Sequence, residues 1–65
     1  MNWDQVEGNW NEYKGRIKER WGKLTDDDLD VINGKREQLA GRIQALYGKQ
    51  REQAERDIDE WRRGI

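Results

Sequence analysis

The chain has 65 residues, of which 13 are basic and 14 acidic, and its formal net charge at pH 7 is −1. A chain of this length buries only about 60% of its unfolded surface, so residues 1–65 are expected to form a single domain. Cysteine and histidine are both absent, which excludes disulfides and argues against a zinc site.

Hydrophobic residues make up 32% of the chain, and the mean hydropathy is −1.42. Because the net charge is close to zero, we interpret the chain as a highly solvated, marginally stable fold and not as a disordered tail. No stretch approaches 18 apolar residues, so no membrane span is expected. The first ten residues lack the features of a signal peptide, which predicts a cytoplasmic location.

The first predicted element is a long helix over roughly residues 3–21. Its apolar residues recur at steps of three and four and fall on about a quarter of the helix circumference. No stretch alternates with period two, so no strand is expected and the predicted fold class is all-α. Gly22 is predicted to end this helix in the left-handed conformation. The apolar stripe consists of Trp3, Val6, Trp10, Tyr13, Ile17, Trp21 and Leu24.

The segment LTDDDLDVI predicts a short second helix. Thr25 is a good N-cap, and the carboxylates of residues 26–28 would meet the positive end of the helix dipole. Leu29 and Ile32 form its inner face, and Gly34 ends it or lies at the junction with the next helix.

Two further helices complete a predicted set of four. The third stops at Gly48, and the fourth starts near Gln50 without a strong cap. Their inner faces carry, respectively, Leu39, Ile43, Leu46 and Tyr47, and Ala54, Ile58, Trp61 and Ile65.

The sequence repeats itself at an offset of 26 residues. GRIKERWGK at residues 15–23 matches GRIQALYGK at residues 41–49, and Val6 matches Ile32 in the same register. A solenoid needs at least three copies. The pattern therefore favours a duplicated helical unit folded back on itself.

Three glycines interrupt the helical pattern on the face opposite the apolar stripes: Gly8, Gly15 and Gly41. An interior glycine weakens a helix by about 1 kcal/mol relative to alanine. They mark kinks or ends, or allow another helix to approach closely, or keep the helices weak. Together with Trp3, near the N-terminus, they form the candidate interaction surface.

The acidic run resembles part of a calcium loop. Asp26, Asp28 and Asp30 would take positions 1, 3 and 5, with Glu37 at position 12. Position 6, however, is Val31, where the sharp turn of such a loop requires glycine. We therefore favour a capped helical turn and expect no metal and no cofactor.

Residues 14–23 carry a local net charge of +4, followed by four aspartates between residues 26 and 30. The basic residues flank the apolar stripe on both sides and do not form one basic face, and the pI is about 5.4. Nucleic acid is therefore a poor candidate partner. The four tryptophans fit the buried stripes better than base-stacking positions. Without Cys, His or Ser, no catalytic constellation is present, and we expect no enzyme.

Residues 8–49 resemble the CsbD-like family of small bacterial general stress proteins, in particular its YjbJ branch. The resemblance rests on WGKLTDDD at residues 21–28 followed by GKREQLAGRIQALYG at residues 34–48. It implies a compact all-α bundle of four to five helices with a SAM-like arrangement, induced in the general stress response. The family has no established catalytic or ligand-binding residues to carry over.

Two functions follow as hypotheses. The first is a non-enzymatic, hydrophilin-like protectant of macromolecules under osmotic, desiccation or stationary-phase stress, acting as a monomer on partly unfolded proteins. The second is a small helical interaction module that binds a protein partner through the candidate interaction surface.

Overall fold

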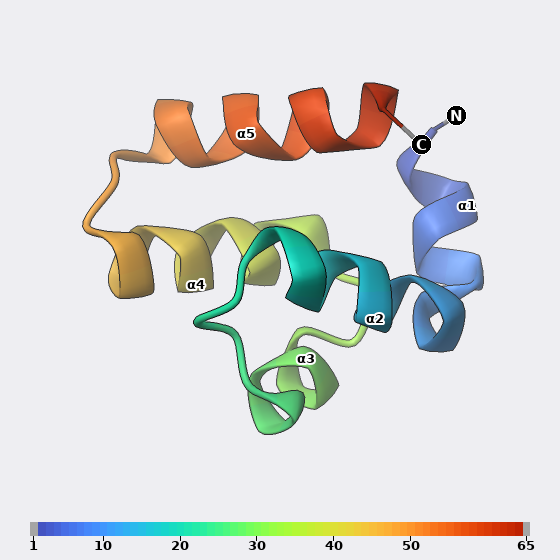
Figure 1. Ribbon diagram of the computed structural model, residues 1–65. Coiled ribbons are helices and arrows are strands. Elements are labelled where there is room, and N and C mark those ends of the chain that lie inside the picture. Colours follow the sequence, from blue (N-terminus) through green and yellow to red (C-terminus); the bar gives the residue numbers. More distant parts are fainter. Residues whose placement is uncertain (1, 65) are drawn as a thin grey trace.

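The computed structural model describes residues 2–64, which form five α-helices and no strand (Figure 1). α4 and α5 pack along one another as an antiparallel hairpin, α3 packs against α4, and α1 packs against α2. The predicted small all-α bundle is confirmed. The helices are α1 (Trp3–Gly8), α2 (Trp10–Arg20), α3 (Asp26–Ile32), α4 (Arg36–Tyr47) and α5 (Arg51–Arg63).

The predicted first helix is in fact two helices. The chain turns at Asn9, whose φ of −115° and ψ of 38° are not helical. This break places α1 across the end of α2 at the edge of the molecule (Figure 1). There Trp3 lies against Trp61, with ring centroids 6.4 Å apart. A tertiary contact therefore overrides the continuous periodicity of the stripe, and the prediction of one helix over 3–21 is wrong.

Thr25 caps α3 as predicted, and it does so through a complete capping box. The Asp28 N–H donates to Thr25 Oγ1, and the Thr25 N–H donates back to Asp28 Oδ2, both at 3.1 Å. The helix ends at Asn33, which is left-handed with φ 47°, and Gly34 follows with φ 82°. Two consecutive left-handed residues reverse the chain into α4.

The two glycines predicted to end helices behave differently. Gly48 adopts the left-handed conformation, with φ 65°, and ends α4 as predicted. Gly22 has no positive φ, so the prediction of a left-handed end there is wrong. α2 instead ends at Trp21, an extended residue with φ −122° and ψ 82°. This exit directs the Trp21 side chain into the core, where it is 1% exposed.

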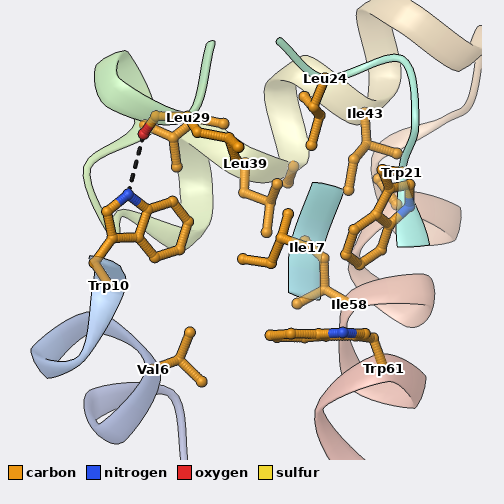
Figure 2. Close-up of a cluster of buried hydrophobic side chains, with 13 residues drawn as sticks. Val6, Trp10, Ile17, Trp21, Leu24, Leu29, Leu39, Ile43, Ile58 and Trp61 are labelled. Carbon is orange, nitrogen blue, oxygen red and sulfur yellow. Dashed lines mark hydrogen bonds between the residues drawn. The ribbon is translucent and has the colours of Figure 1, made fainter. Parts of the chain in front are cut away.

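The core gathers side chains from all five helices and from the α2–α3 turn (Figure 2). The predicted stripes supply all of the buried core except Ala40, and Ile65 lies outside the described residues. The stripe residues Trp3, Tyr13, Leu46 and Tyr47 are only partly buried and pack against the core. Trp10 is buried and its Nε1–H donates to the carbonyl of Leu29 at 3.1 Å. The buried hydrophobic residues are Val6, Trp10, Ile17, Trp21, Leu24, Leu29, Ile32, Leu39, Ala40, Ile43, Ala54, Ile58 and Trp61.

The helix bounds can be compared with the 26-residue repeat. α2 begins at Trp10 and α4 begins at Arg36, which is 26 residues later. Ile17 and Ile43, equivalent in the repeat, are both fully buried. The duplication and the SAM-like arrangement themselves stay predictions. Across residues 2–64, every helix is too short or too polar to cross a membrane.

Candidate functional site

The three glycines of the candidate interaction surface all face solvent. Gly8 is the last residue of α1, next to the break, whereas Gly15 and Gly41 lie inside α2 and α4. A Cβ atom added at any of the three would meet no atom within 4 Å. No other helix of the described chain approaches these glycines closely. Gly8 belongs to a break in the helix, and the approach of another molecule to Gly15 or Gly41 stays a prediction.

Trp3 is half-buried, and its indole holds α1 to the rest of the domain. Its Nε1–H donates to the carbonyl of Gly34 at 2.8 Å. Its ring lies 6.5 Å from that of Trp10 and 6.4 Å from that of Trp61, measured between centroids. Most of the indole is thus engaged within the protein. Its role as a contact for another molecule stays a prediction.

Two open hollows flank α1, and Glu7 lines both of them. One, of about 400 Å³, lies between the α1–α2 bend and Asn33. The other, of about 460 Å³, lies between Trp3 and the first turn of α4. The carboxylate of Glu7 pairs with Lys35 at 3.2 Å.

Gly34 is the residue on which α1 rests. It is buried, although it lies in a turn, and an added Cβ would stand 2.8 Å from Cγ of Glu7. The sequence placed Gly34 at the end of a helix or at the junction with the next one, and it lies at the junction between α3 and α4. Gly34 is equivalent to Gly8 in the 26-residue repeat. This equivalence did not distinguish a close packing contact from a helix end.

The aspartates of the acidic run serve a helix cap and three ion pairs. Asp26 pairs with Lys18 at 2.9 Å, and Asp30 pairs with Lys14 at 3.2 Å. The backbone hydrogen bond from Thr25 is the main reason why the pKa of Asp28 lies below its ordinary value. Asp28 also faces Arg42 at 3.5 Å. Within residues 2–64, no cluster of three or more carboxylate, Cys or His side chains could hold a metal ion.

The basic residues of α2 and of the turn after it are distributed over two kinds of partner. Lys14 and Lys18 face the acidic residues of α3. The remaining cations lie over aromatic rings at 5.0–5.7 Å from the centroids. Their stems cover apolar surface, which agrees with the flanking arrangement predicted from the sequence. The ring pairs are Arg16 with Tyr13, Arg20 with Trp21, and Lys23 with Tyr47.

Sequence reasoning missed one buried carboxylate, Asp57, which is 4% exposed. Lys49 donates to its Oδ2, and Gln53 Nε2–H donates to its Oδ1 at 3.0 Å. The hydrogen bond from Lys49 is the largest cause holding the pKa of Asp57 below its ordinary value; burial acts in the opposite direction. Asp57 lies three residues after Ala54 and four before Trp61, so it is on the apolar face of α5. This spacing is the sequence feature that could have predicted its burial.

A second charged contact fastens α5 to the start of α4. The Arg36 guanidinium reaches Asp59 at 2.8 Å and Glu55 at 3.6 Å. This hydrogen bond from Arg36 is the main cause that lowers the pKa of Asp59. Like the Lys49–Asp57 pair, it joins neighbouring elements of the α4–α5 hairpin. Both contacts are structural ties that hold α5 to the α4–α5 turn and to the start of α4.

These features define a small all-α protein whose described polar groups cap helices and join them. The chain belongs to the CsbD-like family, whose model matches residues 4–56. It is 57% identical to the UPF0337 protein YjbJ of Escherichia coli O6:H1 over 94% of this chain and 88% of that protein. It is 61% identical to a UPF0337 protein of Pectobacterium atrosepticum over the same shares. A third relative, from Rhodopseudomonas palustris, is 57% identical over 94% of this chain and 92% of its own length.

Proposed function

We propose that this protein is a non-enzymatic, hydrophilin-like protectant in the bacterial stress response, acting as a cytoplasmic monomer on partly unfolded proteins. Membership of the CsbD-like family supports the link to stress. The observation that carries the proposal is the pair of solvent-facing glycines inside α2 and α4, Gly15 and Gly41. No packing contact with another part of residues 2–64 requires glycine at either position.

Weak helices give a physical route to protection. Each interior glycine reduces helix stability by about 1 kcal/mol relative to alanine. A domain of this size has only a few kcal/mol of stability to begin with. Local opening of α2 or α4 would transiently present apolar side chains of the core to a partly unfolded protein. The charged surface, with 42% charged residues in the chain, would keep the resulting complex in solution.

The test is freeze–thaw inactivation of a sensitive enzyme, with and without this protein. We expect the wild type to preserve more activity than an equal mass of an inert protein, and a Gly15→Ala/Gly41→Ala variant to preserve less than the wild type. Gln38→Ala, at an exposed position of α4, is the matched control and should protect as the wild type does. If the wild type protects no better than the inert protein, the protectant function is wrong. If the double variant protects equally well, weak helices are not its basis.

The second candidate function is an interaction module for a protein partner. The open space around Gly15 and Gly41 favours it, because a partner's backbone could approach closely there. This function predicts that Gly15→Ala/Gly41→Ala is more stable yet loses a partner that both the wild type and Gln38→Ala recover in a pull-down. Unchanged recovery by the double variant would exclude these glycines as the interface. A salt-sensitive gel shift would point to nucleic acid instead.

A further inference from the structure

The junction between α1 and α2 is a break of a single residue. Asn9 N–H still donates to Gln5 O at 3.1 Å, as in a helix, and Asn9 O accepts from the N–H groups of Glu12 and Tyr13. Only the dihedral angles of Asn9 depart from helical values. Rotating its ψ by about 80°, with a smaller change in φ, would join α1 and α2 into one helix.

The sequence is compatible with both forms. The apolar residues keep helical spacing across the break, so Trp3, Val6 and Trp10 would share one face of a joined helix. In that form α1 would project from the end of α2, away from the body of the domain. Val6, which is fully buried in the bent form, would become exposed to solvent. The joined helix therefore needs a partner for its first two turns.

We infer that α1 is an exchangeable element: two copies of this chain straighten at Asn9 and each docks its α1 on the other copy. The site that one copy's α1 vacates is filled by α1 of the other copy, because that site binds α1 in the bent form. Each contact of α1 with the rest of the domain re-forms between copies. These contacts include the Trp3 Nε1–H···O bond to Gly34, the ring contact of Trp3 with Trp61, the burial of Val6 and the Glu7–Lys35 ion pair.

The surroundings of α1 favour its release. At six residues, α1 is too short to be stable alone in water, so it is held by its docking contacts. Two open hollows adjoin it. Trp10 stays on its own body through its bond to Leu29, so straightening detaches α1 without removing this anchor. An exchange of identical elements is a low-cost route to a symmetric dimer.

Protein concentration and the hinge residue set the balance between the forms. A tethered segment has an effective concentration on the order of mM, so the wild type should dimerise only near that concentration. In the bent form, Asn9 Nδ2 also donates a hydrogen bond to Gln5 O. Asn9→Ala removes this bond and introduces the residue with the highest helix propensity. We expect it to favour the joined helix about tenfold per chain, and dimerisation about 100-fold, since each dimer contains two hinges.

The first experiment measures dimerisation by size-exclusion chromatography with light scattering. Asn9→Ala should form dimers at concentrations about 100-fold lower than the wild type. Asn11→Ala is the matched control, because this exposed asparagine is helical in both forms and should leave the balance unchanged. Asn9→Gly, which disfavours a helical residue 9, should reduce dimerisation. A monomeric Asn9→Ala up to mM concentration, or equal dimerisation by Asn11→Ala, would overturn the inference.

The second experiment identifies which elements are exchanged. Unlabelled and ¹⁵N-labelled Asn9→Ala chains are mixed, the dimer is isolated, and a carbodiimide joins ion-paired carboxylates and amines. Mass spectrometry should find Glu7–Lys35 links between a labelled and an unlabelled chain. Links between Asp26 and Lys18, which lie on α3 and α2, should join only identically labelled peptides. Glu7–Lys35 links confined to one chain would show that the dimer uses another surface and would refute exchange. Neither experiment depends on the protectant function.

Discussion

The side chain of Glu7 rests on the backbone of Gly34, so closely that a Cβ on residue 34 would lie 2.8 Å from its Cγ. The two residues are far apart in the sequence, and their contact fixes α1 against the turn between α3 and α4. The Trp3 hydrogen bond to the Gly34 carbonyl reinforces the same contact. Gly34 therefore has two constraints, a left-handed φ of 82° and a lack of space.

Gly34→Ala should be clearly destabilising. A left-handed conformation costs a non-glycine residue roughly 1–2 kcal/mol, and the new methyl group would also displace the Glu7 side chain. Gly48→Ala is the matched control, since Gly48 is also left-handed, with φ 65°, but has no atom within 4 Å of an added Cβ. Urea denaturation followed by circular dichroism should show a greater loss for Gly34→Ala. Equal losses would mean that α1 does not press on Gly34 in solution.

Thr25→Ala should reduce the free energy of unfolding by about 1 kcal/mol, because it removes the side-chain half of the capping box. Thr25→Ser keeps the hydroxyl that accepts the Asp28 N–H and should restore most of the loss. Thermal melts of the two variants and the wild type give the comparison. A serine variant as unstable as the alanine variant would contradict the role of the hydroxyl as a cap.

Asp57→Asn should cost about 2 kcal/mol at pH 7, since it replaces a buried charge-assisted hydrogen bond with a neutral one. Asp26→Asn is the control: its ion pair with Lys18 is exposed, with the Asp26 side chain 83% accessible, and such pairs contribute about 0–1 kcal/mol. Urea denaturation at pH 7 distinguishes the two. Similar effects of both substitutions would show that burial of Asp57 does not strengthen its bond to Lys49.

The pH dependence follows from three carboxyl groups, Asp28, Asp57 and Asp59, whose pKa values all lie below the ordinary 3.8. A carboxyl whose folded pKa is lower than its unfolded pKa stabilises the fold fully above the unfolded value. It loses this contribution as the pH falls through the folded value. The free energy of unfolding should therefore be nearly constant from pH 7 to about 5 and decrease steadily below pH 3.8. Asp57→Asn should show a shallower decrease, and an unchanged slope would exclude Asp57 as a contributor.

Features encoded by neighbouring residues could be predicted from the sequence. The cap at Thr25 and the left-handed end at Gly48 depend on side chains and backbone within one turn. The buried stripes depend only on helical periodicity. These local rules were sufficient to predict an all-α bundle and most of the residues of its core.

Features that depend on distant contacts could not be predicted. Gly8 was a local signal for a kink next to Asn9, but it did not distinguish a break from a weak continuous helix, because the bend is stabilised by Trp3 docking on Gly34, 31 residues away. Asp57 carried no signal other than its place on an apolar face, since its main partner, Lys49, reaches it from the α4–α5 turn. Gly22 and Gly48 are equivalent in the 26-residue repeat, so the same left-handed conformation was predicted for both. The conformation of Gly22 differs because burial of the neighbouring Trp21 determines how the chain leaves α2.

Two buried tryptophans offer a comparison in which the same substitution has different hydrogen-bonding consequences. Trp10 Nε1–H donates to the Leu29 carbonyl at 3.1 Å, whereas the buried Trp21 Nε1 has no acceptor among residues 2–64. Trp10→Phe and Trp21→Phe both lose buried ring surface. Only Trp10→Phe also loses a hydrogen bond, whose net contribution is about 1 kcal/mol. Trp21→Phe removes an unpaired buried donor, whose burial costs about 1–3 kcal/mol. Trp10→Phe should therefore be the less stable variant by at least about 1 kcal/mol in urea denaturation followed by circular dichroism. An equal or greater loss in Trp21→Phe would show that the Trp21 N–H has an acceptor in solution.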